Sequence, residues 1–311
     1  MQKERRLNIK GRLVLFLIAV CMLVSCSAFT LRASAEGVGE ITRAPQTQSI
    51  SPTLRAVPSR SVGSYASYPI TLYGKTLSDR ALLIGGTLYI PMDGISESVG
   101  ARIRYNSATK ELVVTANGLY LSVKDGAYVT YVNDRPFFTG YNSAVMNNGK
   151  MYVHIDTVMK AFGLSYKRGA SGAVAVSGSF SPPPHASKFY RDDEVLWLSR
   201  IISAESRGEP LLGQIAVGSV VLNRVASSQY PNTIYSVIFD RRYGVQFSPI
   251  IDGSIYNTPT YNCVLAAKIC LEGVRVGEGA LFFLRPSTSS SLWIPTTRKF
   301  LYSIGNHDFY A

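Results

Sequence analysis

Glu205 is the residue whose type and position best suit acid–base chemistry. The sequence predicts a helix from Asp192, in which Leu198 and Ile201 form part of an apolar stripe. Glu205 lies four residues after Ile201, so its side chain projects from that stripe. Burial against hydrophobic groups raises the pKa of a carboxyl, as a general acid working near neutral pH requires. The alternative is a structural carboxylate, neutralised by Arg207, Arg224 or a buried amide. The helical pattern alone leaves both interpretations open.

A glycosidase-type reaction would ordinarily need a second carboxylate. A nucleophile lies about 5 Å from the acid, and a base that activates water lies farther away. The C-terminal part of the chain offers Glu209, Asp240, Asp252 and Asp308. Nothing in the residues around them singles one out.

A long run of motifs around Glu205 resembles the cell wall hydrolase family of the spore cortex-lytic enzymes. The matching segments are Ser203-Ala204-Glu205-Ser206-Arg207-Gly208-Glu209-Pro210, residues 213–225, 230–234 and 246–248, Asp252-Gly253, residues 279–283 and residues 305–310. The resemblance implies a lysozyme-like, mostly helical fold that cleaves peptidoglycan between N-acetylmuramic acid and N-acetylglucosamine. It also implies that Glu205 is the catalytic acid and base of a lytic transglycosylase, which forms a 1,6-anhydro end. The chain departs from many relatives at Arg285-Pro286, where Asn-Pro is common.

Five residues are candidates for binding the glycan. Gln246, Phe247 and Ser248 follow a turn and could contact sugars, although a plain hairpin is an equal alternative. Trp293 could stack on a sugar face or fill the core. Arg207 belongs to the motif of the proposed acid. We expect His307 to be a structural hydrogen-bonding residue.

The N-terminus has the pattern of an export signal. Positive residues precede an apolar run from Leu13 to Val24, and Ala33-Ser34-Ala35 forms a cleavage site. Residues 1–35 are therefore predicted to be a signal peptide. An uncleaved anchor helix, and a lipoprotein lipidated at Cys26, are the alternatives. All three place the rest of the chain outside the cytoplasm, in the extracellular space, cell wall or spore cortex.

An internal repeat lies between two segments of linker composition. Residues 36–67 and the Pro-rich residues 178–189 are expected to be linkers. Between them, residues 86–93 recur as residues 149–156, and each copy continues into a short helical pattern closed by glycine and then a strand. Residues 68–177, the repeat region, are thus predicted to form an α+β domain of two strand–helix–strand units. They resemble the copper amine oxidase N-terminal-like domain, and no copper ligands are evident.

Charge and cysteine usage narrow the classes of partner. The chain of 311 residues has 32 Lys and Arg against 20 Asp and Glu, a net charge of +12. The regional values are +5 for residues 1–35, +6 for 36–189 and +1 for 190–311. With no run of basic residues, nucleic acid is not an expected partner, whereas the repeat region could bind anionic wall polymers or be a plain spacer. Cys263 and Cys270 are seven helical residues apart, about 10 Å, too far for a disulfide. No metal site or cofactor is expected.

These observations predict a multidomain, exported enzyme. The α+β repeat region precedes a mostly helical, lysozyme-like α+β catalytic domain at residues 190–311. The predicted activity is lysis of peptidoglycan glycan strands in wall or cortex. A non-catalytic wall-binding protein, and a hydrolytic muramidase or amidase, are the alternatives.

Overall fold

The computed structural model describes residues 48–51, 65–277, 279–289 and 293–311. All of them belong to one compact unit, Pro45–Ala311. The predicted signal peptide and the lipidation site at Cys26 lie outside the described residues. Within the described ranges, no helix has both the length and the apolar character needed to cross a membrane.

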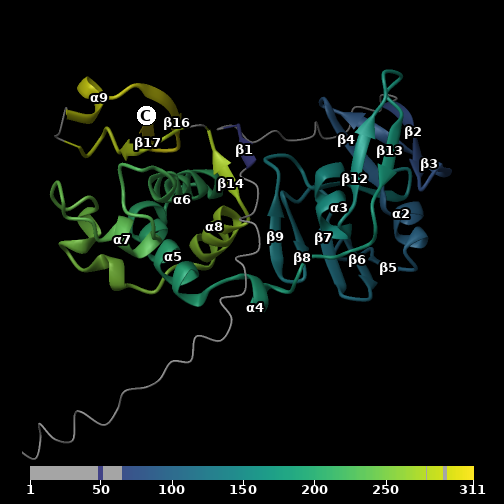
Figure 1. The fold of residues 1–311 in the computed structure, drawn as a ribbon, viewed down its shortest axis with the longest axis horizontal. Helices are drawn as coiled ribbons and strands as arrows, with labels where there is room; N and C mark the ends of the chain where they lie inside the picture. The colour runs from purple at the N-terminus through teal and green to yellow at the C-terminus, as the bar shows by residue number, and fades with distance from the viewer. Residues whose placement is uncertain (1–47, 52–64, 278, 290–292) are drawn as a thin grey trace, which may run out of the picture. The chain divides into compact units, whose positions relative to one another are not determined.

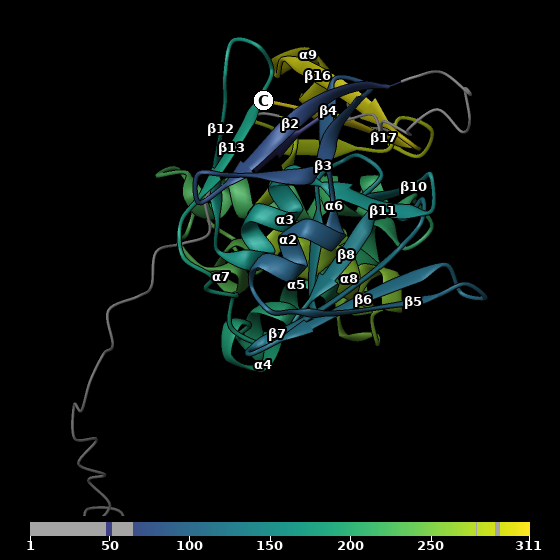
Figure 2. The ribbon, with the colours of Figure 1, turned by 90° about the vertical axis from the view of Figure 1, so that its right-hand side faces the viewer.

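The N-terminal part is rich in strands, as the repeat predicted. It contains a seven-stranded sheet in the order β10-β11-β4-β3-β2-β13-β12 and a five-stranded sheet in the order β5-β6-β7-β8-β9. The elements are β2 (Ala66–Leu72), β3 (Lys75–Ile84), β4 (Thr87–Pro91), α2 (Met92–Ser98), β5 (Arg102–Asn106), β6 (Glu111–Ala116), β7 (Leu119–Lys124), β8 (Val129–Val132), β9 (Arg135–Phe138), β10 (Ala144–Asn147), β11 (Lys150–His154), α3 (Ile155–Phe162), β12 (Ser165–Arg168) and β13 (Val174–Ser177). Helices α2 and α3 lie side by side against these strands (Figures 1 and 2).

The two copies of the repeat meet at a local two-fold axis. Strands β4 and β11 pair antiparallel, with Ile90 opposite Val153, and these two residues occupy equivalent positions 63 apart in the sequence. Each strand leads directly into its helix, and α3 ends at Gly163 with a φ of 69°, a left-handed conformation that favours glycine. The symmetry stops there, because β5 joins the five-stranded sheet whereas β12 joins the seven-stranded one.

The C-terminal part is built on three long helices. Helices α5, α6 and α8 pack on one another, and the short α7 contacts α5 and α6 (Figure 1). A three-stranded sheet in the order β15-β17-β16 lies against α6. The elements are α4 (Ala186–Phe189), α5 (Asp192–Ser206), α6 (Leu211–Ala226), α7 (Ile234–Ile238), the 3₁₀ turns η1 (Ser248–Ile250) and η2 (Ser254–Tyr256), α8 (Tyr261–Leu271), β14 (Val274–Val276), β15 (Phe282–Leu284), α9 (Trp293–Thr297), β16 (Phe300–Ile304) and β17 (His307–Tyr310). Cys263 and Cys270 are buried, free thiols on α8.

The segment before the repeat region is not a linker throughout. Residues Gln48–Ile50 form β1, which pairs in parallel with β14. Ile50 is 6% exposed and belongs to the hydrophobic core of the C-terminal part. The prediction that residues 36–67 form a continuous tether is therefore wrong at β1. One buried isoleucine and an open strand edge are enough to order three residues.

The Pro-rich segment is held against the repeat region by hydrogen bonds to its own backbone groups. The side-chain amide of Asn133 donates to the carbonyl of Pro183 over 2.7 Å, and the amide of Ser181 donates to the carbonyl of Phe162 over 2.9 Å. This part of residues 178–189 is thus a packed connection.

A buried carboxylate at the end of α8 collects partners from other elements. Arg135 on β9 donates two hydrogen bonds to Glu272, over 2.7 and 2.8 Å. Lys160 lies 2.9 Å from the same carboxylate, and the hydroxyl of Tyr190 donates to it over 2.6 Å. Burial raises the pKa of Glu272, but the charges and hydrogen bonds of its partners outweigh burial and lower it. Glu272 is therefore an ionised anchor for β9, α3 and the start of the C-terminal domain.

Candidate active site

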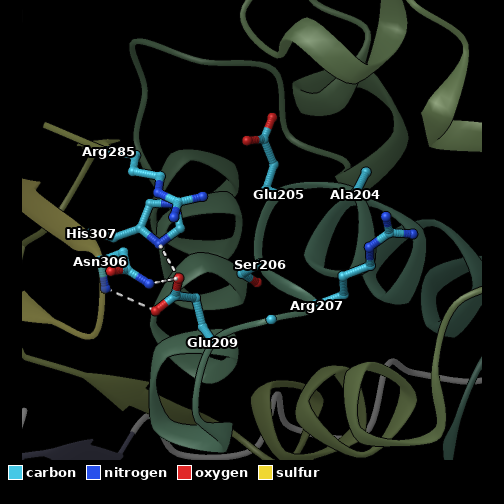
Figure 3. A pocket seen from close by; sticks show the side chains of 9 residues that line it. Ala204, Glu205, Ser206, Arg207, Glu209, Arg285, Asn306 and His307 are labelled. Carbon is cyan, nitrogen blue, oxygen red and sulfur yellow. Dashed lines mark hydrogen bonds and ion pairs between the residues drawn. The ribbon is translucent and has the colours of Figure 1, made fainter. Parts of the chain in front are cut away.

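Glu205 lies in the last turn of α5. Helix α5 packs on both α6 and α8. This packing buries Leu198, Ile201 and Ile202 completely and fixes the position of the helix. Glu205 is partly buried, at the rim of this packed surface, and lines an open pocket of about 320 Å³. The residues around it are shown in Figure 3.

The electrostatic surroundings of Glu205 favour the protonated form. Burial raises its pKa to about 7, the negative charge of Asp252 adds to the rise, and the positive charge of Arg224 opposes it. No hydrogen bond or ion pair joins the Glu205 carboxyl to another described residue, and the carboxyl points away from Glu209 (Figure 3). The structural alternative, neutralisation by Arg207, Arg224 or a buried amide, is not supported by these contacts. A partly dehydrated carboxyl that is half-protonated near neutral pH suits a general acid.

Glu209 lines the same pocket as Glu205 but is held in the ionised form. Its Oε2 accepts the backbone N–H of Asn306 and its Oε1 accepts the Asn306 side-chain amide, both over 2.9 Å. Burial raises the pKa of Glu209, but the hydrogen bonds from Asn306 and the nearby His307 and Arg285 outweigh burial and lower it. Glu209 is thus an ionised carboxylate, and each of its two oxygens accepts a hydrogen bond from Asn306. It ties the start of α6 to the turn between β16 and β17.

The turn can receive Glu209 only because residue 305 is glycine. Gly305 has a φ of 57°, and a Cβ placed there would lie 1.9 Å from Glu209 Oε2. Any other residue would displace the carboxylate from Asn306. The turn dipeptide Gly305-Asn306 is visible in the sequence as a turn signal, but the sequence does not reveal its partner 97 residues away.

His307 is buried, but in the described part of the chain its Nδ1 lacks the hydrogen bond expected of a structural histidine. Its Nδ1 lies 3.7 Å from Glu209 Oε1 and has no hydrogen-bond partner among the described residues. Burial lowers the pKa of His307, with the charge of Glu209 opposing. A neutral imidazole next to the ionised Glu209 is the result.

The remaining carboxylates have other partners. Asp240 pairs with Arg242 over 2.9 Å, and Asp308 accepts a hydrogen bond from Ser303. Asp252 accepts the backbone N–H of Ser254 over 2.8 Å and is exposed. Neither these three residues nor any further carboxylate of the described chain joins Glu205 and Glu209 in lining the pocket.

The structure brings together only some of the residues predicted to bind substrate. Arg207 lines the pocket with Glu205, whereas Gln246, Phe247, Ser248 and Trp293 do not. Gln246 donates to the carbonyl of Gly244 in its own loop, over 3.1 Å. Ser248 is exposed at the start of η1, and Trp293 is 51% exposed with its ring edge-on to Phe282.

Phe247 is a correction to the predicted set. Its side chain is only 3% exposed and packs in the hydrophobic core, so its ring has no face free for a sugar. It lies beneath the buried guanidinium of Arg224, 5.2 Å from ring centre to charge. Arg285 and Asn306 also line the pocket, although neither was predicted from the sequence to be a binding residue.

Metal-binding side chains are not clustered in this region. Across the described ranges, no group of three or more His, Cys, Asp or Glu residues is arranged to hold a metal ion.

Two family models match separate stretches of the chain. Residues 208–310 match the family model described as Cell Wall Hydrolase. The C-terminal domain is a cell wall hydrolase domain. Residues 71–174 match the model described as Copper amine oxidase N-terminal domain, which confirms the second resemblance. Glu205 lies three residues before the matched stretch of the cell wall hydrolase domain.

The relatives that match the cell wall hydrolase domain are named as spore cortex-lytic enzymes. A "Spore cortex-lytic enzyme" of Bacillus cereus is 36% identical over 151 residues, which are 47% of this chain and 56% of the relative. Another, of Oceanobacillus iheyensis, is 30% identical over 170 residues, 54% of this chain and 60% of the relative. The chain thus spans less than two thirds of either relative. A solved catalytic domain of the germination-specific lytic transglycosylase SleB from Bacillus anthracis is 38% identical, with a TM-score of 0.36, over 39% of this chain and 97% of that one.

Proposed function

We propose that the chain is a peptidoglycan-lytic enzyme that cleaves the bond between N-acetylmuramic acid and N-acetylglucosamine, with Glu205 as its acid. The observation that carries the proposal is the Glu205 carboxyl itself, which is partly buried, without a hydrogen-bond partner among the described residues, and open to a pocket. A pKa of about 7 leaves about half of the molecules protonated at neutral pH. The names of the relatives, spore cortex-lytic enzymes, support the substrate class.

We further propose lytic transglycosylation as the route. Glu205 gives its proton to the glycosidic oxygen as the bond from that oxygen to the anomeric carbon breaks. The C6 hydroxyl of the muramic residue then attacks the anomeric carbon and returns its proton to Glu205, which leaves a 1,6-anhydro end. This route needs one carboxyl, and Glu209, the other carboxylate lining the pocket, is held in the ionised form by two hydrogen bonds from Asn306. Hydrolysis would instead call on Asp252, whose charge acts on Glu205.

Several broader assignments belong to the same proposal. The helices α5 to α8 around one core support a lysozyme-like fold for residues 190–311. Export to the wall or cortex is supported by the signal pattern of residues 1–35. Binding of anionic wall polymers by residues 68–177 is supported by the positive charge of residues 36–189.

The test compares the full chain with Glu205→Gln on purified peptidoglycan, with mass spectrometry of the released ends. We expect the wild type to release fragments with anhydro ends, and the variant to fold normally, by circular dichroism, and release none. Reducing ends would overturn the transglycosylase route in favour of hydrolysis. Peptidoglycan pull-down without release by the wild type would instead identify a binding protein. Undiminished release by Glu205→Gln would remove Glu205 from the mechanism.

A further inference from the structure

Arg285 is a positively charged residue of the pocket. Its guanidinium has no role in stabilising the described part of the fold. It follows β15 directly and lines the same pocket as Glu205 and Glu209. Its carbonyl accepts the amides of Thr288 and Ser289, which fixes the backbone of the turn. Its guanidinium, in contrast, makes no hydrogen bond or ion pair with any residue in the described ranges. In Figure 3 the side chain extends from its strand end toward the side of the pocket that holds Glu205.

No acid of the described chain forms an ion pair with Arg285. The positive charge of Arg285 contributes to the lowered pKa of Glu209. The hydrogen bonds of the Glu209 carboxylate, however, come from Asn306 and not from Arg285. His307 is a neutral ring at neutral pH, because burial lowers its pKa. Glu205 carries a proton in about half of the molecules at pH 7. Arg285 therefore presents five donors in a planar fork to the pocket that Glu205 also lines.

The planar fork of a guanidinium matches a carboxylate, with which it forms two parallel hydrogen bonds. The sugar that receives the new bond in the proposed reaction, muramic acid, differs from its neighbour by a 3-O-lactyl group. That group ends in a free carboxylate when the stem peptide has been removed, and it carries the carboxylates of the peptide when the stem is present. It is neutral when the lactyl carboxyl is closed onto the 2-amino group as a lactam.

We propose that Arg285 is a specificity-determining residue that binds a carboxylate carried by the muramic acid substituent next to the scissile bond. The proposal rests on the proposed function, since it assigns the substrate class of the same pocket. Glycan with an anionic substituent is then the preferred substrate, and lactam glycan is the poorer one.

The experiment uses the full chain and three glycan preparations: sacculi with stem peptides, the same sacculi stripped of peptides by an amidase, and glycan rich in muramic lactam. Wild type is compared with Arg285→Gln, Arg285→Lys and Arg285→Glu. Lys299→Gln, which removes one exposed positive charge outside the pocket, is the control of equal charge change. The readout is kcat/KM for release of glycan fragments from each preparation.

We expect Arg285→Gln to lose about 10- to 100-fold in kcat/KM on anionic glycan, the range of a charged hydrogen-bonded pair. On lactam glycan it should lose less than threefold, and Lys299→Gln should match wild type on all preparations. Arg285→Lys should recover part of the loss, and Arg285→Glu should be the poorest variant on anionic glycan only. The preparation that shows the larger loss, with or without peptides, identifies which carboxylate is bound.

Equal losses on all three preparations would overturn the proposal and make Arg285 a structural residue. No loss on any preparation would also overturn it. If the wild type released nothing from any preparation, the proposed function itself would fail, which is a different outcome from a failure of the Arg285 assignment.

Discussion

Glu205 and Glu209 are four residues apart and line one pocket, yet their pKa values move in opposite directions. Burial works to raise the pKa of both. Glu209 receives two hydrogen bonds from Asn306, which stabilise its charged form, whereas Glu205 receives none from the described residues. One carboxyl is thus a proton carrier and the other a fixed negative charge. The difference is made by the turn between β16 and β17, which reaches one of them and not the other.

The first prediction concerns the pH dependence of activity. A general acid must be protonated, and Glu205 has a pKa of about 7. We expect kcat/KM to fall about tenfold per pH unit above pH 7, as measured by fragment release at constant ionic strength. A rate that stays constant up to pH 9 would contradict the role of Glu205 as acid.

The second prediction concerns the stability of Glu205→Gln. Folded Glu205 holds its proton more tightly than an ordinary glutamate with a pKa of 4.5. The wild type therefore loses stability as pH rises from about 4.5 to 7, and the amide variant escapes that loss. The melting temperature of Glu205→Gln minus that of wild type should be larger at pH 8 than at pH 4. The exposed Glu97→Gln serves as the control, and a pH-independent difference would contradict the unfavourable burial of Glu205.

The third prediction is a double-mutant cycle at Glu209 and Gly305. Glu209→Ala should cost about 1.5–3 kcal/mol of unfolding free energy through the lost hydrogen bonds to Asn306. Gly305→Ala should cost at least as much, because its new Cβ displaces the Glu209 carboxylate. In the Glu209→Ala background the same change should cost only about 1 kcal/mol for the left-handed backbone. Additive costs in urea unfolding would show that the two residues are not coupled.

The fourth prediction concerns the buried pair of Arg135 and Glu272. Glu272→Gln leaves Arg135 without its ionic partner and should cost about 3–5 kcal/mol. Replacing both residues by Met should cost less than the sum of the single changes. Because partners lower the pKa of Glu272, the stability that its charge provides is present above about pH 4.5 and is lost as pH falls through the folded value. Acid unfolding of Glu272→Gln should therefore be shallower than that of wild type.

The sequence predicted features that depend on local pattern. The strand–helix steps of the repeat region follow from the recurrence of residues 86–93 at residues 149–156, and the position of Glu205 follows from the helical period of α5. The repeat identifies Ile90 and Val153 as equivalent residues, and these two residues pair in the structure. Each of these depends on neighbours in the chain or on a second copy of the same segment.

Contacts across long stretches of sequence were not predictable. Asn306 meets Glu209 across 97 residues, and Arg135 meets Glu272 across 137, with no periodicity that relates them. Phe247 was misplaced for a similar reason. A single aromatic residue in an irregular loop has no pattern that tells burial from exposure, and its burial depends on the distant Arg224 and Phe283.

The pairing of β1 with β14 has a mechanical consequence. Both ends of the repeat region are attached to the C-terminal domain, one through β1 and the other through the chain that leads into α5. A force applied at residue 48 is therefore transmitted to the C-terminal domain through the β1–β14 ladder. The repeat region lies outside this path and carries none of the load. While that three-residue ladder holds, tension on the chain cannot pull apart the sheets of the repeat region.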